Sequence, residues 1–363
     1  MQSLPSFSAV VEWENARLSG AERATCMLRA LFAQVAELSS RLELRPELII
    51  LYERDAVSTQ LIETALRRAA ESEIPLEVRL TGTNGSSYYN QKNEGAELAS
   101  RDYLLFLDSD VIPEPGWLEA LLGSLGRGID VVAGSTYVDT KTFFGRAFGL
   151  FWFFPVRSNE SGLREVKTFF ANNVLFRRDL FLANKFPDLP LYRGQCSFVG
   201  IRLRRRGVRL FLQGDARVAH PPPSPRHFAH RALCEGFDVT ARWILFAKPR
   251  NDGPGELGRQ IGNLKERIKT RAEQIGAGRS DVIAAIVLGS AYCLLRVAGQ
   301  KWADRSPEAA QRALGIRSSR PLQRIVPDVP AVARGPVPAA GKRRSAGASD
   351  LDGPLFLPAS TSG

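Results

Sequence analysis

Short apolar runs alternate with amphipathic segments along the first part of the chain. The runs have strand length, are nearly continuous, and lie at residues 6–13, 46–53, 75–82, 102–108 and 130–138. Between them, apolar residues recur at helical spacing over residues 21–38, 57–72 and 115–125, and residues 86–100 suggest a loop that enters a helix. Nearly continuous apolar strands that alternate with helices predict an α/β fold with a mostly parallel sheet, flanked by helices on both faces.

Polar residues follow these strands at the end where ligands of such sheets bind. Asp108 and Asp110 follow the run "YLLFL", Glu14 and Asn15 follow the first strand, and Glu53 ends the second. Residues two apart in an extended backbone point to the same side, so the two aspartates can face one cation. Mg2+ or Mn2+ prefers such oxygen ligands and leaves positions for substrate phosphates. Solvated turns also contain D-x-D triplets, so the position at a strand end is what favours a metal site.

Composition and charge narrow the class of protein. The 363 residues are 44% hydrophobic and 24% charged, which is typical of a globular protein with one large domain or two domains. A net charge of +11 favours anionic partners: phosphate groups, nucleic acid or an acidic membrane surface. Four scattered cysteines argue against a zinc site and fit a reducing compartment. No basic segment with a long apolar run opens the chain, so we expect no signal peptide and a cytoplasmic protein.

Three regions are expected along the chain. Residues 1–235 hold the strand–helix alternation and the segments that complete it, and residues 236–305 form a C-terminal helical extension. Residues 306–363 are rich in Pro, Ala, Arg and Ser, and such a composition predicts a disordered tail. Residues 282–295 are free of charge but shorter than the ~20 residues that span a bilayer. This stretch fits either a core helix or a helix in the membrane interface, flanked by Arg279, Arg296 and Lys301.

Several segments occur in an order that resembles the GT-A glycosyltransferases of family 2. They are SAVVEWENA, ELIILYERD, NQKNEGAELASRDYLLFLDSDVIPEPGWLEALL, FFANNVLFRRDLF and RLRRRGVRLFLQGDARVAHPPP, within residues 6–235. The third is the strongest match, since it joins a basic-Asn-x-Gly helix start, the D-x-D strand and a P-x-W-L helix. The resemblance implies a GT-A fold with a nucleotide-binding sheet. It also implies metal-dependent transfer of a sugar from a nucleotide-diphosphate sugar to an acceptor hydroxyl, with inversion.

The resemblance also implies roles for individual residues. Asp108 is expected at the ribose or the metal, Asp110 at the metal, and His220 at the metal or the diphosphate. The base and ribose are expected to contact Trp13, Glu14, Asn15 and Glu53, and the diphosphate Lys92 and Asn93. The acceptor side is expected to contain Asn172, Asn173, Arg193 and Gln195. Taken alone, His220 also fits a loop histidine, Trp13 a core side chain and Lys92 a solvated charge.

The chain departs from the family pattern where the general base is expected. The family places an acidic pair before its late helix, and "GQC" stands there, with Gln195 and Cys196 in place of the two acids. Glutamine cannot accept a proton, and a thiol is an unusual base for a sugar hydroxyl. Three explanations remain open: another carboxylate such as Asp188 serves as the base, the acceptor needs no base, or the protein binds donors without transferring sugar.

Two other classes of protein compete with this interpretation. A haloacid-dehalogenase-type phosphatase also has an apolar strand that ends in D-x-D, and "DVVAGST" is similar to its second motif. That class normally opens with this strand and needs a later acidic pair, whereas only Asp215 follows "VRLFLQG". The runs "RLRRRGVR" and "GKRRSAG" suggest a nucleic-acid-binding protein, but no RNA-recognition signature accompanies them. We therefore expect a saccharide or lipid-linked acceptor, no nucleic acid, and peripheral contact with the inner face of the cell membrane.

Overall fold

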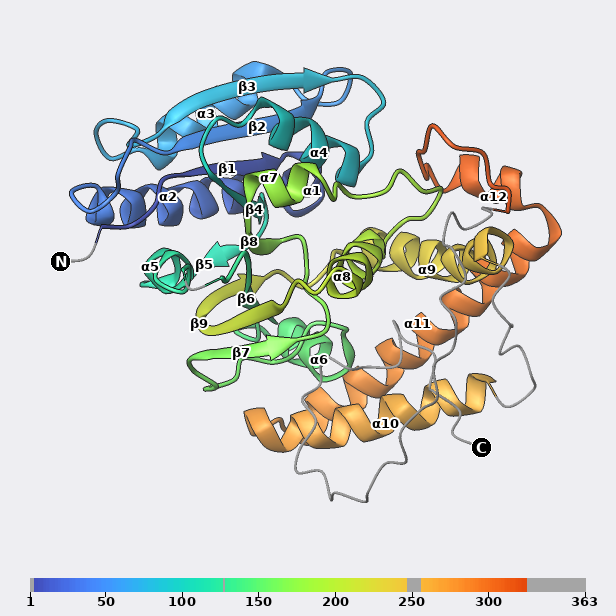
Figure 1. Ribbon diagram of the computed structural model, residues 1–363. Helices are drawn as coiled ribbons and strands as arrows, with labels where there is room; N and C mark the ends of the chain where they lie inside the picture. Colours follow the sequence, from blue (N-terminus) through green and yellow to red (C-terminus); the bar gives the residue numbers. More distant parts are fainter. Residues whose placement is uncertain (1–2, 127, 247–255, 325–363) are drawn as a thin grey trace, which may run out of the picture.

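One nine-stranded sheet runs through the described part of the chain, which comprises residues 3–126, 128–246 and 256–324 of the computed structural model (Figure 1). Its order is β3-β2-β1-β4-β8-β6-β9-β5, and β7 pairs with β9. The strands are β1 (Phe7–Glu12), β2 (Glu47–Glu53), β3 (Glu77–Thr83), β4 (Tyr103–Asp108), β5 (Ile112–Pro113), β6 (Val131–Val138), β7 (Leu163–Val166), β8 (Asn173–Arg177) and β9 (Leu210–His220).

The order in which strands are added to the sheet changes side at β1. From β1 the chain proceeds to β2 and β3 on one side and then returns to β4 on the other side, with all four strands parallel. The register pairs Glu12 of β1 with Asp108 of β4, so both carboxylates lie at the carboxyl ends of strands where the order reverses. Such a switch point opens a crevice for ligands. The apolar runs predict β1 to β4 and β6, β9 pairs in parallel with β6, and the antiparallel pairings all involve β5, β7 or β8.

Helices cover both faces of the sheet, as predicted. Successive residues of β4 point to opposite faces: Leu105 joins the core beneath α2, α3 and α5, and Phe106 joins the core beneath α4, α7 and α8. Both side chains are fully buried, which explains why the strand is apolar at every position. The helices of this part are α1 (Glu14–Ser19), α2 (Ala21–Leu38), α3 (Thr59–Ala69), α4 (Tyr88–Leu98), α5 (Trp117–Leu122), α6 (Phe143–Phe151), α7 (Arg178–Leu182) and α8 (Gln195–Arg205).

Four further helices lie together beside the sheet (Figure 1): α9 (Pro225–Phe246), α10 (Glu256–Ile275), α11 (Arg279–Arg305) and α12 (Pro307–Ala313). Helix α11 packs along α9 and against α6, and glycines allow the close approach. A Cβ added at Gly236 would lie 2.0 Å from the carbonyl oxygen of Arg296, and one at Gly299 would lie 2.2 Å from that of Leu233. Helix α9 also runs through the predicted boundary at residue 235, so the helical extension begins as a continuation of the same helix.

The predicted start of disorder at residue 306 is corrected. Residues 307–313 form α12, and Ala310, Leu314 and Ile316 are buried against Phe237 and other apolar residues of α9. The average composition of residues 306–363 did not indicate this helix. A few apolar side chains are enough to order a short segment when another helix provides the apolar surface against which they pack. Residues 325–363 of the predicted tail lie outside the described residues.

Candidate active site

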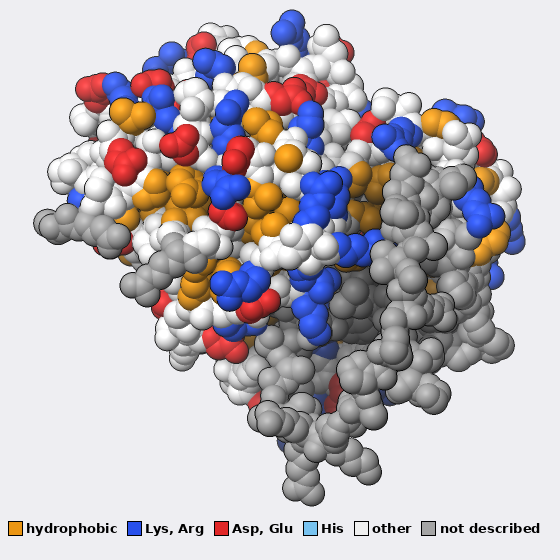
Figure 2. Space-filling view, viewed as in Figure 1, with side chains coloured by type: hydrophobic (Ala, Val, Ile, Leu, Met, Phe, Trp, Pro, Cys, Tyr) orange, Lys and Arg blue, Asp and Glu red, His pale blue; other side chains and the backbone are white. Residues whose placement is uncertain are grey.

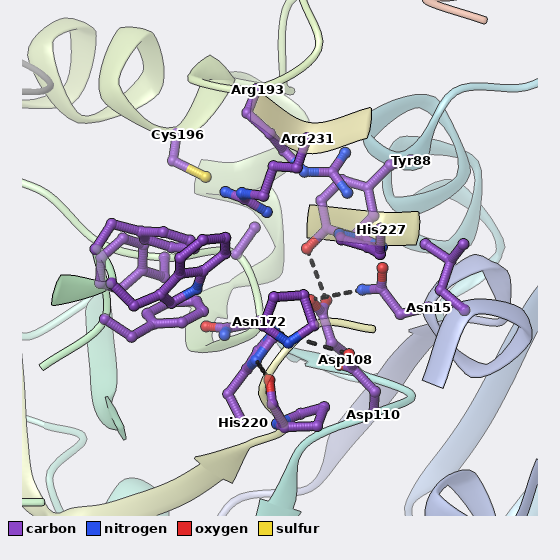
Figure 3. Close-up of a pocket in the computed structure, with 18 of the residues that line it drawn as sticks. Asn15, Tyr88, Asp108, Asp110, Asn172, Arg193, Cys196, His220, His227 and Arg231 are labelled. Carbon is purple, nitrogen blue, oxygen red and sulfur yellow. Dashed lines mark hydrogen bonds and ion pairs between the residues drawn. The ribbon is translucent and has the colours of Figure 1, made fainter. Parts of the chain in front are cut away.

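Asp108 is held in place by two hydrogen bonds and an ion pair at the end of β4. The hydroxyl of Tyr88 donates to Oδ1 at 2.6 Å, and the amide of Asn15 donates to Oδ2 at 3.0 Å (Figure 3). The ammonium of Lys92 lies 2.8 Å from Oδ1 and is fully buried beneath the carboxylate. The charge of Asp108 is therefore balanced within the protein, and its side chain has little freedom to move.

Asp110 has a buried oxygen that remains free. Among the described residues, Oδ1 of Asp110 has no hydrogen-bond partner, and Oδ2 lies 3.7 Å from Nε2 of His220. Burial raises the pKa of Asp110, and burial lowers that of His220. The Nδ1–H of His220 donates to the carbonyl oxygen of Pro221 at 2.7 Å, which leaves the Nε2 lone pair of the neutral ring beside Asp110. A buried carboxylate oxygen without a partner is costly, and these donors fit a hard divalent cation.

Glu12 is a site residue that the sequence reasoning missed. It is completely buried beneath Asn15, and its carboxylate accepts from the backbone N–H of Asn15 at 3.1 Å and from the side-chain amide at 2.9 Å. Burial and the nearby Asp108 raise the pKa of Glu12 well above its usual range. Its signal in the sequence is an acidic residue inside an otherwise apolar strand, one residue before Trp13. Glu12 orients the amide that in turn holds Asp108.

A cavity of about 1040 Å³ opens at the two aspartates. One wall is aromatic and is formed by Trp152, Phe153, Phe154, Phe169 and Phe170. The lining also includes Arg193, Arg231 and His227, which lie above Asp108 in Figure 3, and the guanidinium of Arg231 stacks 4.2 Å from the ring centre of Phe153. Such a cavity, with carboxylates at its floor and with cations and flat apolar rings in its lining, suits a ligand that combines phosphate groups with a sugar.

Arg193 stands where this cavity meets a second one. Its guanidinium stacks 4.3 Å from the ring centre of Tyr88 and 4.5 Å from that of Tyr192. The buried carboxylate of Asp238 in α9 accepts from the backbone N–H groups of Tyr192 and Arg193 at 2.7 and 3.0 Å, and so fixes this loop. No carboxylate within the described residues lies within ion-pair distance of the Arg193 guanidinium. Its charge is available to an anionic ligand in either cavity.

The second cavity lies at the carboxyl ends of β1 and β2 and has a volume of about 1060 Å³. Glu14, Glu53 and Gln195 line it, together with Arg193 and residues 314–317 of the C-terminal region. The carboxylate of Glu53 accepts from the backbone N–H of Gly85 at 2.8 Å. Glu14 and Glu53 thus line the same cavity, and their contact with a base and ribose stays a prediction.

The two residues considered as general bases do not have the geometry or the protonation state for that role. Cys196 lines the first cavity, but its thiol contacts the hydroxyl of Tyr89 at 3.4 Å, and burial raises the pKa of Cys196 to about 11. It is therefore a protonated thiol at neutral pH. Asp188 is outside both cavity linings, and its carboxylate accepts from the backbone N–H of Ser319 at 2.9 Å and from the Ser319 hydroxyl. The structure does not bring Asp188 to the acceptor.

Four other predicted residues lie in the interior rather than in the cavities. Trp13 is 1% exposed and belongs to the core beneath α2, so its core interpretation is correct. Lys92 reaches Asp108 from below and cannot touch a diphosphate above it. Asn93 exchanges two hydrogen bonds with the backbone of Phe186. Asn173 accepts from the indole N–H of Trp117 at 2.8 Å, whereas Asn172 does line the first cavity.

The C-terminal helices supply functional side chains that the sequence pattern did not reveal. His227 and Arg231 come from α9. Arg271 of α10 is 2% exposed and donates to the carbonyl oxygens of Gly149, Trp152 and Phe154, which clamps the loop that carries the aromatic wall. The only local signal for this wall is the density of aromatic residues in "FGLFWFFPV". The extension is therefore part of the site.

Comparison with known proteins agrees with the family that the sequence resembles. The family described as Glycosyl transferase family 2 matches residues 27–183. A glucosyl-dolichyl phosphate glucuronosyltransferase of Haloferax volcanii is 33% identical over 230 residues, which cover 57% of this chain and 72% of that protein. The fold and the carboxylates at its switch point define a GT-A-type protein. The chain belongs to glycosyltransferase family 2 and is a glycosyltransferase.

Two solved structures are similar in architecture. The mannosyltransferase PcManGT from Pyrobaculum calidifontis, in complex with GDP-Man and Mn2+, has a TM-score of 0.49 and 16% identity, over 82% of this chain and 88% of that one. S. aureus TarS residues 1–349, in complex with UDP, has a TM-score of 0.43 and 15% identity, over 79% of this chain and 91% of that one.

The basic run of α8 lies away from the site. Its last turn carries Arg202, Arg204 and Arg205, and basic side chains gather over this part of the face shown in Figure 2. Arg204 and Arg205 are exposed, as expected of a solvated helix face. Asp215, the residue considered for a phosphatase, accepts from the backbone N–H of Gly162 at 2.8 Å and lines neither cavity.

Proposed function

We propose that the protein transfers a sugar from a nucleotide-diphosphate sugar to an acceptor hydroxyl, with inversion and with a divalent cation. The observation that carries this proposal is the free, buried oxygen of Asp110 beside the fully satisfied carboxylate of Asp108, at the switch point between β1 and β4. The nucleotide occupies the cavity with Glu14 and Glu53, and the sugar lies against the aromatic wall of the other cavity. The diphosphate crosses between them beside Arg193.

Asp110 and Asp108 would hold Mg2+ or Mn2+, with Nε2 of His220 at the same place. When bound, such an ion neutralises the charge that grows on the leaving diphosphate. The protein supplies the remaining effects. Asn15, Tyr88 and Lys92 keep Asp108 oriented, Arg193 adds a positive charge beside the diphosphate, and the aromatic wall excludes water from the sugar.

We infer that His227 accepts the acceptor's proton. In an inverting transfer, the acceptor oxygen bonds to the sugar carbon, the bond from that carbon to the diphosphate breaks, and the hydroxyl proton moves to a base. Burial and the nearby Arg231 lower the pKa of His227 to about 3, so the ring is neutral at neutral pH, with a lone pair that can accept a proton but is only weakly basic in the empty site. The negative diphosphate of a bound donor raises this pKa and makes His227 a better base.

We further propose that the acceptor is lipid-linked, as the substrate in the name of the Haloferax volcanii relative is, and that α11 contacts the inner face of the membrane. By length and composition, α11 is the one helix within the described residues that could cross a membrane, and 17% of its most apolar window is buried in the fold. Ile283, Val287 and Leu294 are more than half exposed and lie on one side of it. Packing of the other side against α9 and α6 favours a helix that lies in the interface.

A thermal-shift screen of the full chain tests the donor assignment. UDP-, GDP- and dTDP-sugars are added with and without Mn2+. Selective stabilisation by one nucleotide, greater with Mn2+, is expected because a ligand that binds only the folded state raises the melting temperature. Equal melting temperatures with every donor would contradict the proposed function. Vesicle flotation with Val287→Asp then tests the membrane contact, and the exposed Glu273→Asp in α10 is the control.

A further inference from the structure

The segment after α12 returns to the nucleotide cavity from the far end of the chain. Gly315 has a φ of 64° and ends α12, with the backbone N–H of Ile316 bonded to the carbonyl of Gln311 and that of Gly315 bonded to Arg312. This is the double hydrogen bond of a Schellman motif, which turns the chain sharply at a glycine. Residues 314–319 are here called the C-terminal strap, and residues 314–317 of it line the cavity that also contains Glu14 and Glu53.

The strap is anchored on both sides of this cavity. Leu314 and Ile316 are 5% and 7% exposed and pack against Leu189 and Leu191, in the loop before α8, and against α9. Nε2 of His230 bonds to the carbonyl oxygen of Leu314 at 3.0 Å. At its other end, Ser319 donates to the carboxylate of Asp188. The carboxylate considered as a catalytic base instead fastens the strap.

Arg317 connects the strap directly to the base end of the cavity. Its Nη1 lies 2.8 Å from Oε2 of Glu53, while Oε1 of Glu53 accepts from Gly85. The Glu53 side chain is 14% exposed and that of Arg317 is 52% exposed, so the carboxylate is enclosed and the guanidinium reaches solvent. These two contacts orient the carboxylate of Glu53 and leave lone pairs that can accept from another N–H group.

We propose that the C-terminal strap is a wall of the nucleotide site and that Arg317 is a positioning residue, which holds Glu53 to accept an N–H of the nucleobase. This inference rests on the proposed function. Residues 314–317 line this cavity together with Glu14 and Glu53, so the strap bounds the space in which the base would lie. The ligand class is a nucleoside diphosphate whose base presents an N–H group, as uracil, thymine and guanine do.

Calorimetric titration of UDP, GDP and dTDP into the full chain with Mn2+ tests this inference. Arg317→Ala is expected to weaken binding of the preferred diphosphate about tenfold, because the carboxylate of Glu53 loses the guanidinium that orients it. Arg317→Lys should retain most of the affinity. The matched control is Arg320→Ala, which removes an exposed arginine just beyond the strap and should bind as the wild type does.

A double-mutant cycle separates positioning from a purely structural role. If Arg317 acts through Glu53, the pair Glu53→Gln with Arg317→Ala binds no more weakly than Glu53→Gln alone. Additive losses, or an Arg317→Ala variant that binds as tightly as wild type or more tightly, would overturn the inference while leaving the proposed function intact. If the wild type binds none of the three diphosphates, the proposed function fails, and the inference fails with it.

Discussion

The side-chain amide of Asn15 donates to Asp108 at 3.0 Å and to Glu12 at 2.9 Å, and so ties the carboxyl ends of β1 and β4 together. One amide thus serves two buried carboxylates on neighbouring strands. Replacing it with an apolar group leaves both without this donor, and buried acceptors that lose a partner are costly.

We therefore expect Asn15→Ala to lower the free energy of unfolding by about 1–3 kcal/mol and to weaken nucleotide binding. Urea denaturation and calorimetry measure the two effects. The exposed Asn84→Ala serves as the control and should change neither. An Asn15→Ala protein with wild-type stability would show that the bridge contributes nothing to the fold.

Asp110→Asn separates metal binding from folding. The substitution removes a buried charge whose Oδ1 has no partner within the described residues, so the metal-free fold should be as stable as the wild type or more stable. The stabilisation that Mn2+ adds in the presence of the preferred nucleotide should disappear. Thermal shifts with and without Mn2+ check both effects, and an unchanged Mn2+ dependence would refute the assignment of Asp110 to the cation.

We expect substitutions of His227 and Cys196 to affect kcat differently. His227→Gln should lower kcat about 100-fold with little change in KM for the donor, the lower end of what a general base contributes. Cys196→Ala should keep kcat near that of the wild type, because the thiol is protonated and bound to Tyr89. Steady-state kinetics with saturating donor distinguish the two. A large loss in Cys196→Ala together with an active His227→Gln would reverse the assignment.

The lowered pKa of His227 also predicts how stability responds to acid. The unfolded chain binds a proton at this residue below its ordinary pKa of 6.5, whereas the folded protein does so only near pH 3. The folded state is therefore progressively disfavoured as the pH falls below 6.5. Stability differences between wild type and His227→Gln, measured by denaturation from about pH 7.5 to pH 5, isolate this effect from other groups. The wild type should lose more stability than the variant, and parallel curves would contradict the shift.

Substitution of Arg271 tests whether α10 holds the aromatic wall of the first cavity in position. Arg271→Met keeps much of the side chain's volume but leaves the carbonyl oxygens of Gly149, Trp152 and Phe154 without their buried donor. We expect a loss of about 3 kcal/mol or more in the free energy of unfolding, and a higher KM for the donor. The exposed Lys269→Met on the same helix is the control. Wild-type kinetics in Arg271→Met would mean that the aromatic wall keeps its position without this clamp.

Local sequence was a good guide wherever a residue's role follows from its own strand or helix. Nearly continuous apolar runs predicted β1, β2, β4 and β6 because most of their positions are buried, whereas the edge strand β3 is largely exposed and was predicted from a shorter apolar pattern. The position of Asp108 and Asp110 at a strand end could be deduced from the same pattern, and so could the placement of Glu14 and Glu53 at the carboxyl ends of strands, where they line the second cavity. The burial of Lys92 could not be predicted, since nothing in the sequence around this helix start indicates that the lysine lies beneath a carboxylate.

The periodicity of the chain by itself determined the α/β architecture and the location of the carboxylates, because hydrophobic spacing reports which faces of each element are buried. Only the tertiary structure decided what surrounds those carboxylates. Arg317 reaches Glu53 across 264 positions of sequence, α9 places His227 in the lining of the first cavity, and Arg271 of α10 holds the loop that carries Trp152 and Phe154. Such contacts depend on how distant elements pack against one another, and local sequence patterns do not predict that packing.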